Sequence, residues 1–103
     1  MKPLEDVRII SLGQYMSAPY CTMLLADMGA EVIKVERPGK EDPRRGIAPY
    51  PDTEKENPTG GGFMAYNRNK KSIVIDLRSE EGKNIYKSLV EKSDIVVENM
   101  RPG

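Results

Sequence analysis

The sequence predicts an α/β fold, in which a Rossmann-like parallel sheet alternates with helices. Short runs rich in β-branched residues recur along the chain, and segments with helical periodicity separate them. The runs are VRIISL (7–12), EVIKVE (31–36), SIVIDL (72–77) and DIVVE (94–98). Because strands that alternate with helices favour right-handed crossover connections, the sheet is expected to be parallel.

The first expected strand, residues 7–12, ends at Gly13, and a helix is expected over residues 20–28. Pro19 suits its first turn, because the N–H group that proline lacks has no partner there. Gly29 follows as a left-handed cap. A wide apolar stripe predicts a helix buried over much of its surface; its members are Tyr20, Met23, Leu24, Leu25, Ala26 and Met28. Cys21 lies among these residues and is expected to be a buried thiol.

The second expected strand, residues 31–36, ends at the turn Arg37-Pro38-Gly39. From there to about residue 64, proline, glycine and charged residues interrupt every periodic pattern. Loops longer than about 12 to 15 residues are usually functional or disordered, so we expect a surface segment near a ligand. The run Gly60-Gly61-Gly62 indicates a flexible loop, and no chemistry is assigned to it.

The third expected strand, residues 72–77, leads into a helix capped by Ser79 with two glutamates in its first turn. One apolar face is formed by Gly82, Ile85, Tyr86, Leu89 and Val90, and Lys92 closes the helix. Residues 94–98 then form a fourth strand, whose consecutive β-branched residues suit a sheet covered on both faces.

No further helix follows the fourth strand, so we expect the incomplete N-terminal part of a larger domain, with its last strand uncovered. Exposed strand and helix faces favour association. We therefore expect the isolated chain to be poorly stable and catalytically silent.

The composition restricts the class of protein. The chain has 103 residues, which fits one domain over residues 1–103. Sixteen basic and sixteen acidic residues cancel, so no overall field is expected to attract nucleic acid or a membrane. No segment approaches the roughly 20 apolar residues of a membrane span, and we expect a cytoplasmic protein. The absence of histidine excludes histidine metal ligands and general bases within this stretch, and no metal is expected.

A ligand site is expected at the carboxyl ends of the strands, where open α/β sheets bind their ligands. Arg37, Arg78 and Arg101 each follow a predicted strand end within about three residues. Because guanidinium groups pair well with phosphate oxygens, a phosphate-bearing ligand is one interpretation. The alternative is that these arginines only solvate the loops.

Two further patterns have weaker interpretations. The run Asn67-Arg68-Asn69-Lys70-Lys71 is either a solvated charge run or a phosphate site. Glu36 closes the second strand, where a dinucleotide-binding domain places the carboxylate that holds a ribose. The glycine fingerprint G-x-G-x-x-G is absent after the first strand, so NAD binding has little support.

Three long blocks of the chain, residues 3–39, 67–83 and 93–103, resemble family III CoA-transferases, a group that also includes acyl-CoA racemases. The resemblance implies a bilobed enzyme several times longer than this chain, assembled as an interlocked homodimer. The present residues would begin its large Rossmann-like domain. The loop after Arg37 departs from the family pattern, because Glu41-Asp42-Pro43-Arg44 lacks the usual glycine.

The resemblance also implies that coenzyme A, as free CoA or acyl-CoA substrate, lies at the strand ends. It assigns the contacts to Met16, Ser17, Arg37, Ile75, Asp76, Leu77, Arg78, Asn99, Met100 and Arg101. Arg37 and Arg78 would pair with anionic groups or stack on adenine.

In the transferases, a family aspartate attacks the acyl-CoA, and CoA then passes to an acceptor carboxylic acid. That residue would lie beyond Gly103, so no catalytic residue is assigned here. Two alternatives stay open: an acyl-CoA racemase or isomerase of the same family, and a catalytically inactive CoA-binding fragment.

Overall fold

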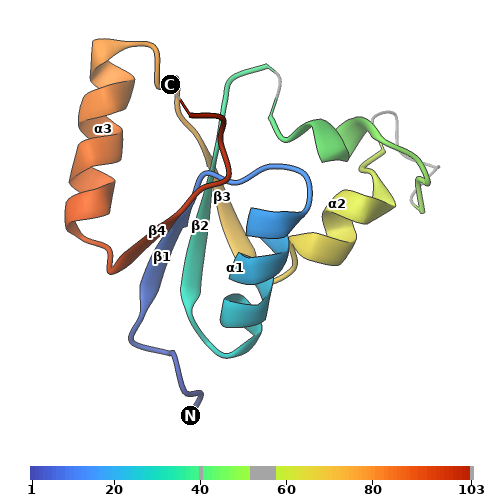
Figure 1. Cartoon of the computed structure of the whole chain (residues 1–103), viewed down its shortest axis with the longest axis horizontal. Helices are drawn as coiled ribbons and strands as arrows, with labels where there is room; N and C mark the ends of the chain where they lie inside the picture. The colour runs from blue at the N-terminus through green and yellow to red at the C-terminus, as the bar shows by residue number, and fades with distance from the viewer. Residues whose placement is uncertain (40, 52–57, 103) are drawn as a thin grey trace.

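The structure is a computed structural model that describes residues 1–39, 41–51 and 58–102 (Figure 1). Its elements are β1 (Arg8–Ser11), α1 (Ser17–Asp27), β2 (Glu31–Glu36), the 3₁₀ helix η1 (Pro43–Gly46), α2 (Gly61–Tyr66), β3 (Lys70–Val74), α3 (Glu80–Glu91) and β4 (Ile95–Val97). The four strands form one parallel sheet in the order β3-β2-β1-β4. The predicted Rossmann-like α/β class is therefore confirmed.

Helices α1 and α3 lie on opposite faces of the sheet (Figure 1). Successive residues of a strand point to opposite faces, and β1 shows this at its centre. Ile9 packs with Ala26 on the α1 side, whereas Ile10 packs with Tyr86 and Leu89 on the α3 side. Both isoleucines are fully buried. The core is therefore divided into two layers by the sheet.

Helix α1 contacts the sheet mainly through small residues, which corrects two predictions. Its buried residues are Ala18, Pro19, Thr22, Met23 and Ala26, whereas Tyr20, Leu24 and Met28 are exposed. Cys21 is exposed as well, so the prediction of a buried thiol is wrong. The physical reason is the orientation of the helix: the face that carries Thr22 approaches the sheet, where its hydroxyl lies 3.5 Å from that of Ser11, and Cys21 falls outside this face.

The segment after residue 36, in which the sequence shows no periodic pattern, contains two short helices, η1 and α2. Gly61 and Gly62 form the first turn of α2, and Gly60 precedes it. A Cβ atom on Gly60 would collide with the carbonyl oxygens of Ile47 and Arg44. The glycines therefore permit close packing and do not form a flexible loop. Residues 40 and 52–57 of this predicted loop lie outside the described residues.

The second half of the chain follows the prediction closely. The Ser79 hydroxyl accepts a hydrogen bond of 2.9 Å from the Gly82 N–H and caps α3 as expected. Strand β3 begins two residues before the predicted strand and ends at Val74. Strand β4 forms an edge of the sheet, and its Ile95 and Val96 are 43% and 41% exposed. The prediction that this strand is covered on both faces is therefore wrong. The expectation that the last strand of the chain is uncovered is confirmed.

Within the described ranges, no helix is long and apolar enough to cross a membrane.

Candidate functional site

A cavity of about 510 Å³ lies at the carboxyl ends of the strands, where the sequence places a ligand. The segment that follows each of the four strands contributes to its wall. The lining residues are Leu12, Gln14, Val35, Glu36, Arg37, Pro38, Ile75, Asp76, Leu77, Arg78 and Met100.

Six of the ten residues predicted to contact CoA line this cavity: Arg37, Ile75, Asp76, Leu77, Arg78 and Met100. The other four are not part of the lining. Met16 and Ser17 stand exposed at the start of α1, and Arg101 is exposed beyond β4. The structure thus brings two of the three predicted arginines to one cavity and leaves the third outside it.

The turn after β3 is held by its own hydrogen bonds. Asp76 accepts a bond of 3.0 Å from the Arg78 N–H through its side chain, and a bond of 2.9 Å from the Ser79 hydroxyl through its carbonyl oxygen. A Cβ atom on Gly82 would collide with that same carbonyl, so only glycine permits this approach of α3. The backbone of Arg78 is therefore fixed before any ligand binds.

The Asn99 side chain joins the end of β4 to the loop after β1. Its Oδ1 accepts a bond of 3.0 Å from the Gln14 N–H, and its Nδ2 donates to the Gln14 carbonyl at 3.0 Å and to the Ser17 hydroxyl at 3.2 Å. These bonds position Gln14, which lines the cavity. Direct contact of Asn99 with a ligand stays a prediction.

Glu36 is buried at the end of β2, and its carboxylate is occupied by protein groups. It accepts two bonds of 2.8 Å from Arg45, one of 3.1 Å from the Asp42 N–H, and one from the Ser72 hydroxyl. Burial raises its pKa, but the bonds from Arg45, Ser72 and Asp42 outweigh burial and lower the pKa from 4.5 to about 2. The carboxylate therefore stays ionised and has little capacity left for a ribose.

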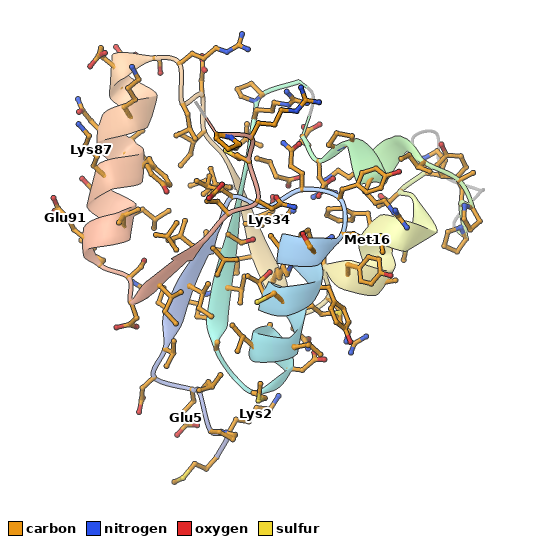
Figure 2. All side chains as sticks on the ribbon, in the orientation of Figure 1. Lys2, Glu5, Met16, Lys34, Lys87 and Glu91 are labelled. Atoms are coloured by element: carbon orange, nitrogen blue, oxygen red, sulfur yellow. The ribbon has the colours of Figure 1, made fainter. Side chains whose placement is uncertain are left out.

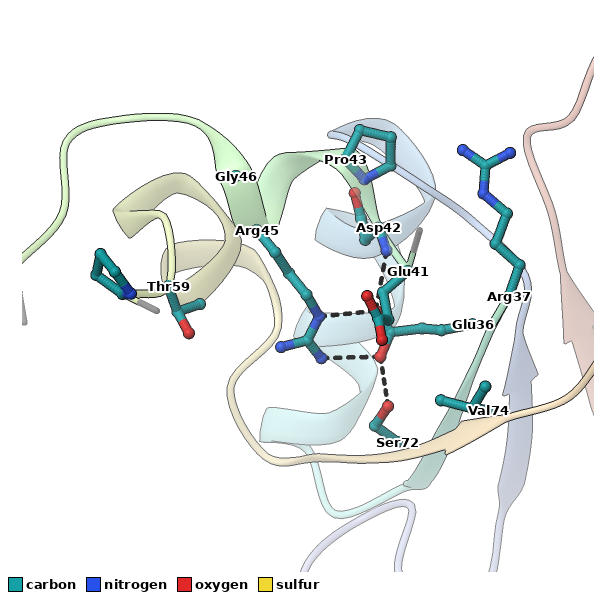
Figure 3. A pocket seen from close by; sticks show the side chains of 11 residues that line it. Glu36, Arg37, Glu41, Asp42, Pro43, Arg45, Gly46, Thr59, Ser72 and Val74 are labelled. Atoms are coloured by element: carbon teal, nitrogen blue, oxygen red, sulfur yellow. Dashed lines mark hydrogen bonds and ion pairs between the residues drawn. The ribbon is translucent and has the colours of Figure 1, made fainter. Parts of the chain in front are cut away.

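A second cavity of about 760 Å³ shares Glu36 and Arg37 with the first (Figure 3). Its wall comes from η1, the end of β3 and residues 58–59. Arg45 crosses it to reach Glu36 and stacks on Phe63, with its guanidinium carbon 3.8 Å from the ring centroid. This cavity was not predicted, because it forms only when η1 folds back onto β2.

Sequence reasoning also missed a buried ion pair next to the site. The Lys34 ammonium lies 2.9 Å from an oxygen of Asp42, and the two side chains are 2% and 0% exposed. The sequence did contain a signal for this pair, because Lys34 lies between Ile33 and Val35 in an apolar strand. A lysine is rarely buried without an acidic partner, so its position predicts one.

The basic run ends in the first two residues of β3, and its cations bind groups of the protein. Arg68 binds Asp27 with two hydrogen bonds of 3.2 and 2.6 Å, and Lys71 binds Glu31 at 2.6 Å. Lys70 donates to the carbonyl of Pro19 and to Asn67, both at 2.9 Å. Arg68 and Lys71 therefore bind the end of α1 and the start of β2, whereas the Lys70 ammonium reaches the first turn of α1. None of these three cations lines the 510 Å³ cavity.

Burial and the nearby Lys34 ammonium lower the pKa of Lys70 from 10.5 to about 7.

The chain is similar to known proteins over its whole length. Residues 4–103 match the family model of CoA-transferase family III. The chain is 48% identical to succinyl-CoA:mesaconate CoA-transferase of Haloarcula hispanica, over 100% of this chain and 26% of that protein. It is 46% identical to succinyl-CoA:glutarate CoA-transferase of Mus musculus, over 100% of this chain and 23% of that protein. It therefore spans about a quarter of the length of these curated relatives.

Solved structures share the fold. A CAIB/BAIF family protein from Brucella suis superposes with a TM-score of 0.87 at 37% identity, over 96% of this chain and 26% of that one. A hypothetical protein from Mycobacterium tuberculosis superposes with a TM-score of 0.86 at 38% identity, over 100% of this chain and 27% of that one.

Proposed function

Because this chain belongs to CoA-transferase family III, we propose that it supplies the CoA-binding strand ends of an enzyme that moves CoA between an acyl-CoA and a carboxylic acid. The relatives named above carry succinyl-CoA as the donor in their names, so we propose succinyl-CoA as donor and a carboxylic acid as acceptor. Because these relatives are transferases, we favour transfer over racemisation. No residue of this chain is assigned to the acyl-transfer step.

The observation that carries this proposal is the cavity at the strand ends with Arg37 and Arg78 in its wall. Among the described residues, the other charged ones in its lining are Glu36, which Arg45 neutralises, and Asp76. Coenzyme A carries phosphate groups, and a guanidinium donates paired hydrogen bonds to phosphate oxygens. Ile75, Leu77 and Met100 add apolar surface for the uncharged parts of the molecule.

Calorimetric titration of the 103-residue chain with CoA tests the proposal. We expect saturable binding that Arg37→Ala and Arg78→Ala each weaken by about 10-fold or more, because a charged hydrogen bond contributes roughly 1.5–3 kcal/mol. The matched control is Lys87→Ala, whose side chain stands on the outer face of α3 (Figure 2). NAD should not displace CoA.

Equal CoA affinity in wild type and both arginine variants would contradict the proposal. So would displacement of CoA by NAD at equal concentration. Circular dichroism of each variant shows whether a loss of binding comes from loss of the fold.

A further inference from the structure

We propose that the buried ion pair of Lys34 and Asp42 is a positioning element, which holds the loop between β1 and α1 in the shape that the CoA site requires. This inference rests on the proposed function, because the two residues are proposed to act on the same site indirectly, through the backbone of the loop. Neither side chain lines the 510 Å³ cavity. Figure 2 shows Lys34 inside the molecule, between the sheet and the start of α1.

Lys34 joins three segments that are distant in sequence. From the middle of β2, its ammonium donates to the carbonyl oxygen of Gly13 at 2.8 Å and pairs with Asp42 at 2.9 Å. Gly13 lies near the start of the loop after β1, and Asp42 caps η1. One buried cation therefore fixes the start of the loop relative to the sheet and to η1.

Asp42 holds the next part of the same loop. Its two carboxylate oxygens lie 3.3 and 3.4 Å from the Tyr15 N–H, and Oδ1 also accepts a bond of 3.0 Å from the Arg44 N–H. Tyr15 has a φ of 73°, which is disfavoured for a residue with a side chain. Such a backbone persists only where its surroundings hold it, and Asp42 supplies that hold.

The composition of the pair indicates positioning more than stability. A buried ion pair is often no more stabilising than apolar residues of similar volume. Apolar side chains, however, could neither donate to the Gly13 carbonyl nor accept from the Tyr15 N–H. The pair therefore fixes the backbone conformation of the loop at Gly13 and Tyr15, which apolar packing alone would not do.

The loop connects the pair to the site. Gln14, between the two anchored residues, lines the cavity, and Asn99 binds it from the β4 side. Met16 and Ser17, both predicted to contact CoA, follow directly. A loop released from Lys34 and Asp42 would move all three, although the cavity arginines would stay in place.

The test uses the double variant Lys34→Met/Asp42→Leu, which leaves no buried charge unpaired and removes the partners of Gly13 and Tyr15. The matched control is Asp27→Asn/Arg68→Met, which removes an ion pair at the amino ends of the strands. Three quantities are measured for both: hydrogen exchange of the amides of residues 14–17, the urea midpoint, and calorimetric affinity for CoA. If the double variant does not fold, Asp42→Asn replaces it.

We expect the Lys34/Asp42 variant to stay folded, to exchange its loop amides at least 10-fold faster than wild type, and to bind CoA at least 10-fold more weakly. The control should keep loop protection and affinity within two-fold. A folded Lys34/Asp42 variant with unchanged loop exchange would overturn the positioning role, and faster exchange with unchanged affinity would overturn its link to the site. Absence of CoA binding by wild type would instead contradict the proposed function, while the exchange measurement still decides the role of the pair.

Discussion

The Arg45 guanidinium donates two hydrogen bonds of 2.8 Å to Glu36, one from Nε to Oε1 and one from Nη2 to Oε2. This paired geometry neutralises a carboxylate that is only 4% exposed at the rim of the sheet. The charge of Arg37, the next residue, is therefore not cancelled by Glu36. The same two bonds anchor η1 to β2. They therefore both set the charge next to Arg37 and stabilise the packing of η1 on the sheet.

The Glu36 carboxylate predicts a loss of stability in acid. Its pKa is about 2 in the folded protein and 4.5 when unperturbed, so its stabilising effect is complete above the higher value and is lost as pH falls toward the lower. Between pH 6 and pH 3 this loss is about 2 kcal/mol. Urea unfolding of wild type and Glu36→Gln at both pH values measures it. An unchanged difference between the two proteins would contradict the prediction.

The lowered pKa of Lys70 predicts that stability also rises with pH, in the range above neutrality. The folded protein releases this proton near pH 7, whereas the unfolded chain holds it until about pH 10.5, so stability should rise over that interval. We expect a gain of about 3 kcal/mol from pH 7 to pH 9.5 in urea unfolding. Lys70→Met should remove most of this gain, and Lys71→Met, at the exposed neighbouring position, should keep it. A gain that persists in Lys70→Met would refute the assignment.

Gly60 and Gly46 form a matched pair for testing the tight packing between η1 and α2. A Cβ atom on Gly60 would meet the carbonyls of Ile47 and Arg44, whereas one on Gly46 would meet nothing within 4 Å. Gly60→Ala should therefore lower the free energy of unfolding by about 2 kcal/mol, and Gly46→Ala should change it by less than about 0.5 kcal/mol. Equal effects in thermal unfolding would show that η1 does not pack against Gly60 in solution.

The exposure of Cys21 predicts fast reaction with a thiol reagent. The native protein should react with dithionitrobenzoate at a rate within about 10-fold of that of the urea-unfolded chain, since no opening step is required. Cys21→Ser supplies the blank. Protection by several orders of magnitude would mean that this face of α1 is covered in solution.

The elements that sequence reasoning predicted well are those with local causes. The strands at Ile9, Val32 and Ile95 follow from β-branched runs, and α3 follows from the Ser79 cap together with one apolar face. The cavity at the strand ends follows from topology, since parallel strands present their carboxyl ends on one side.

The parts that could not be predicted depend on contacts between distant residues. Lys34 and Asp42 lie on opposite sides of the turn after β2. Gly60 packs against the carbonyl oxygens of Arg44 and Ile47, which precede it by more than ten residues. Neither contact leaves a periodic pattern in the sequence. The burial of Cys21 was predicted wrongly, because spacing shows which residues share a helix face but not which face approaches the sheet.

The most direct test of CoA binding at the strand ends is amide hydrogen exchange of the 103-residue chain with and without saturating CoA. We predict added protection in residues 13–17 and 75–78 and around Met100, with little change in α2. Protection confined to α2 and η1, or no added protection at any amide, would contradict the placement of the CoA site in the cavity of Arg37 and Arg78.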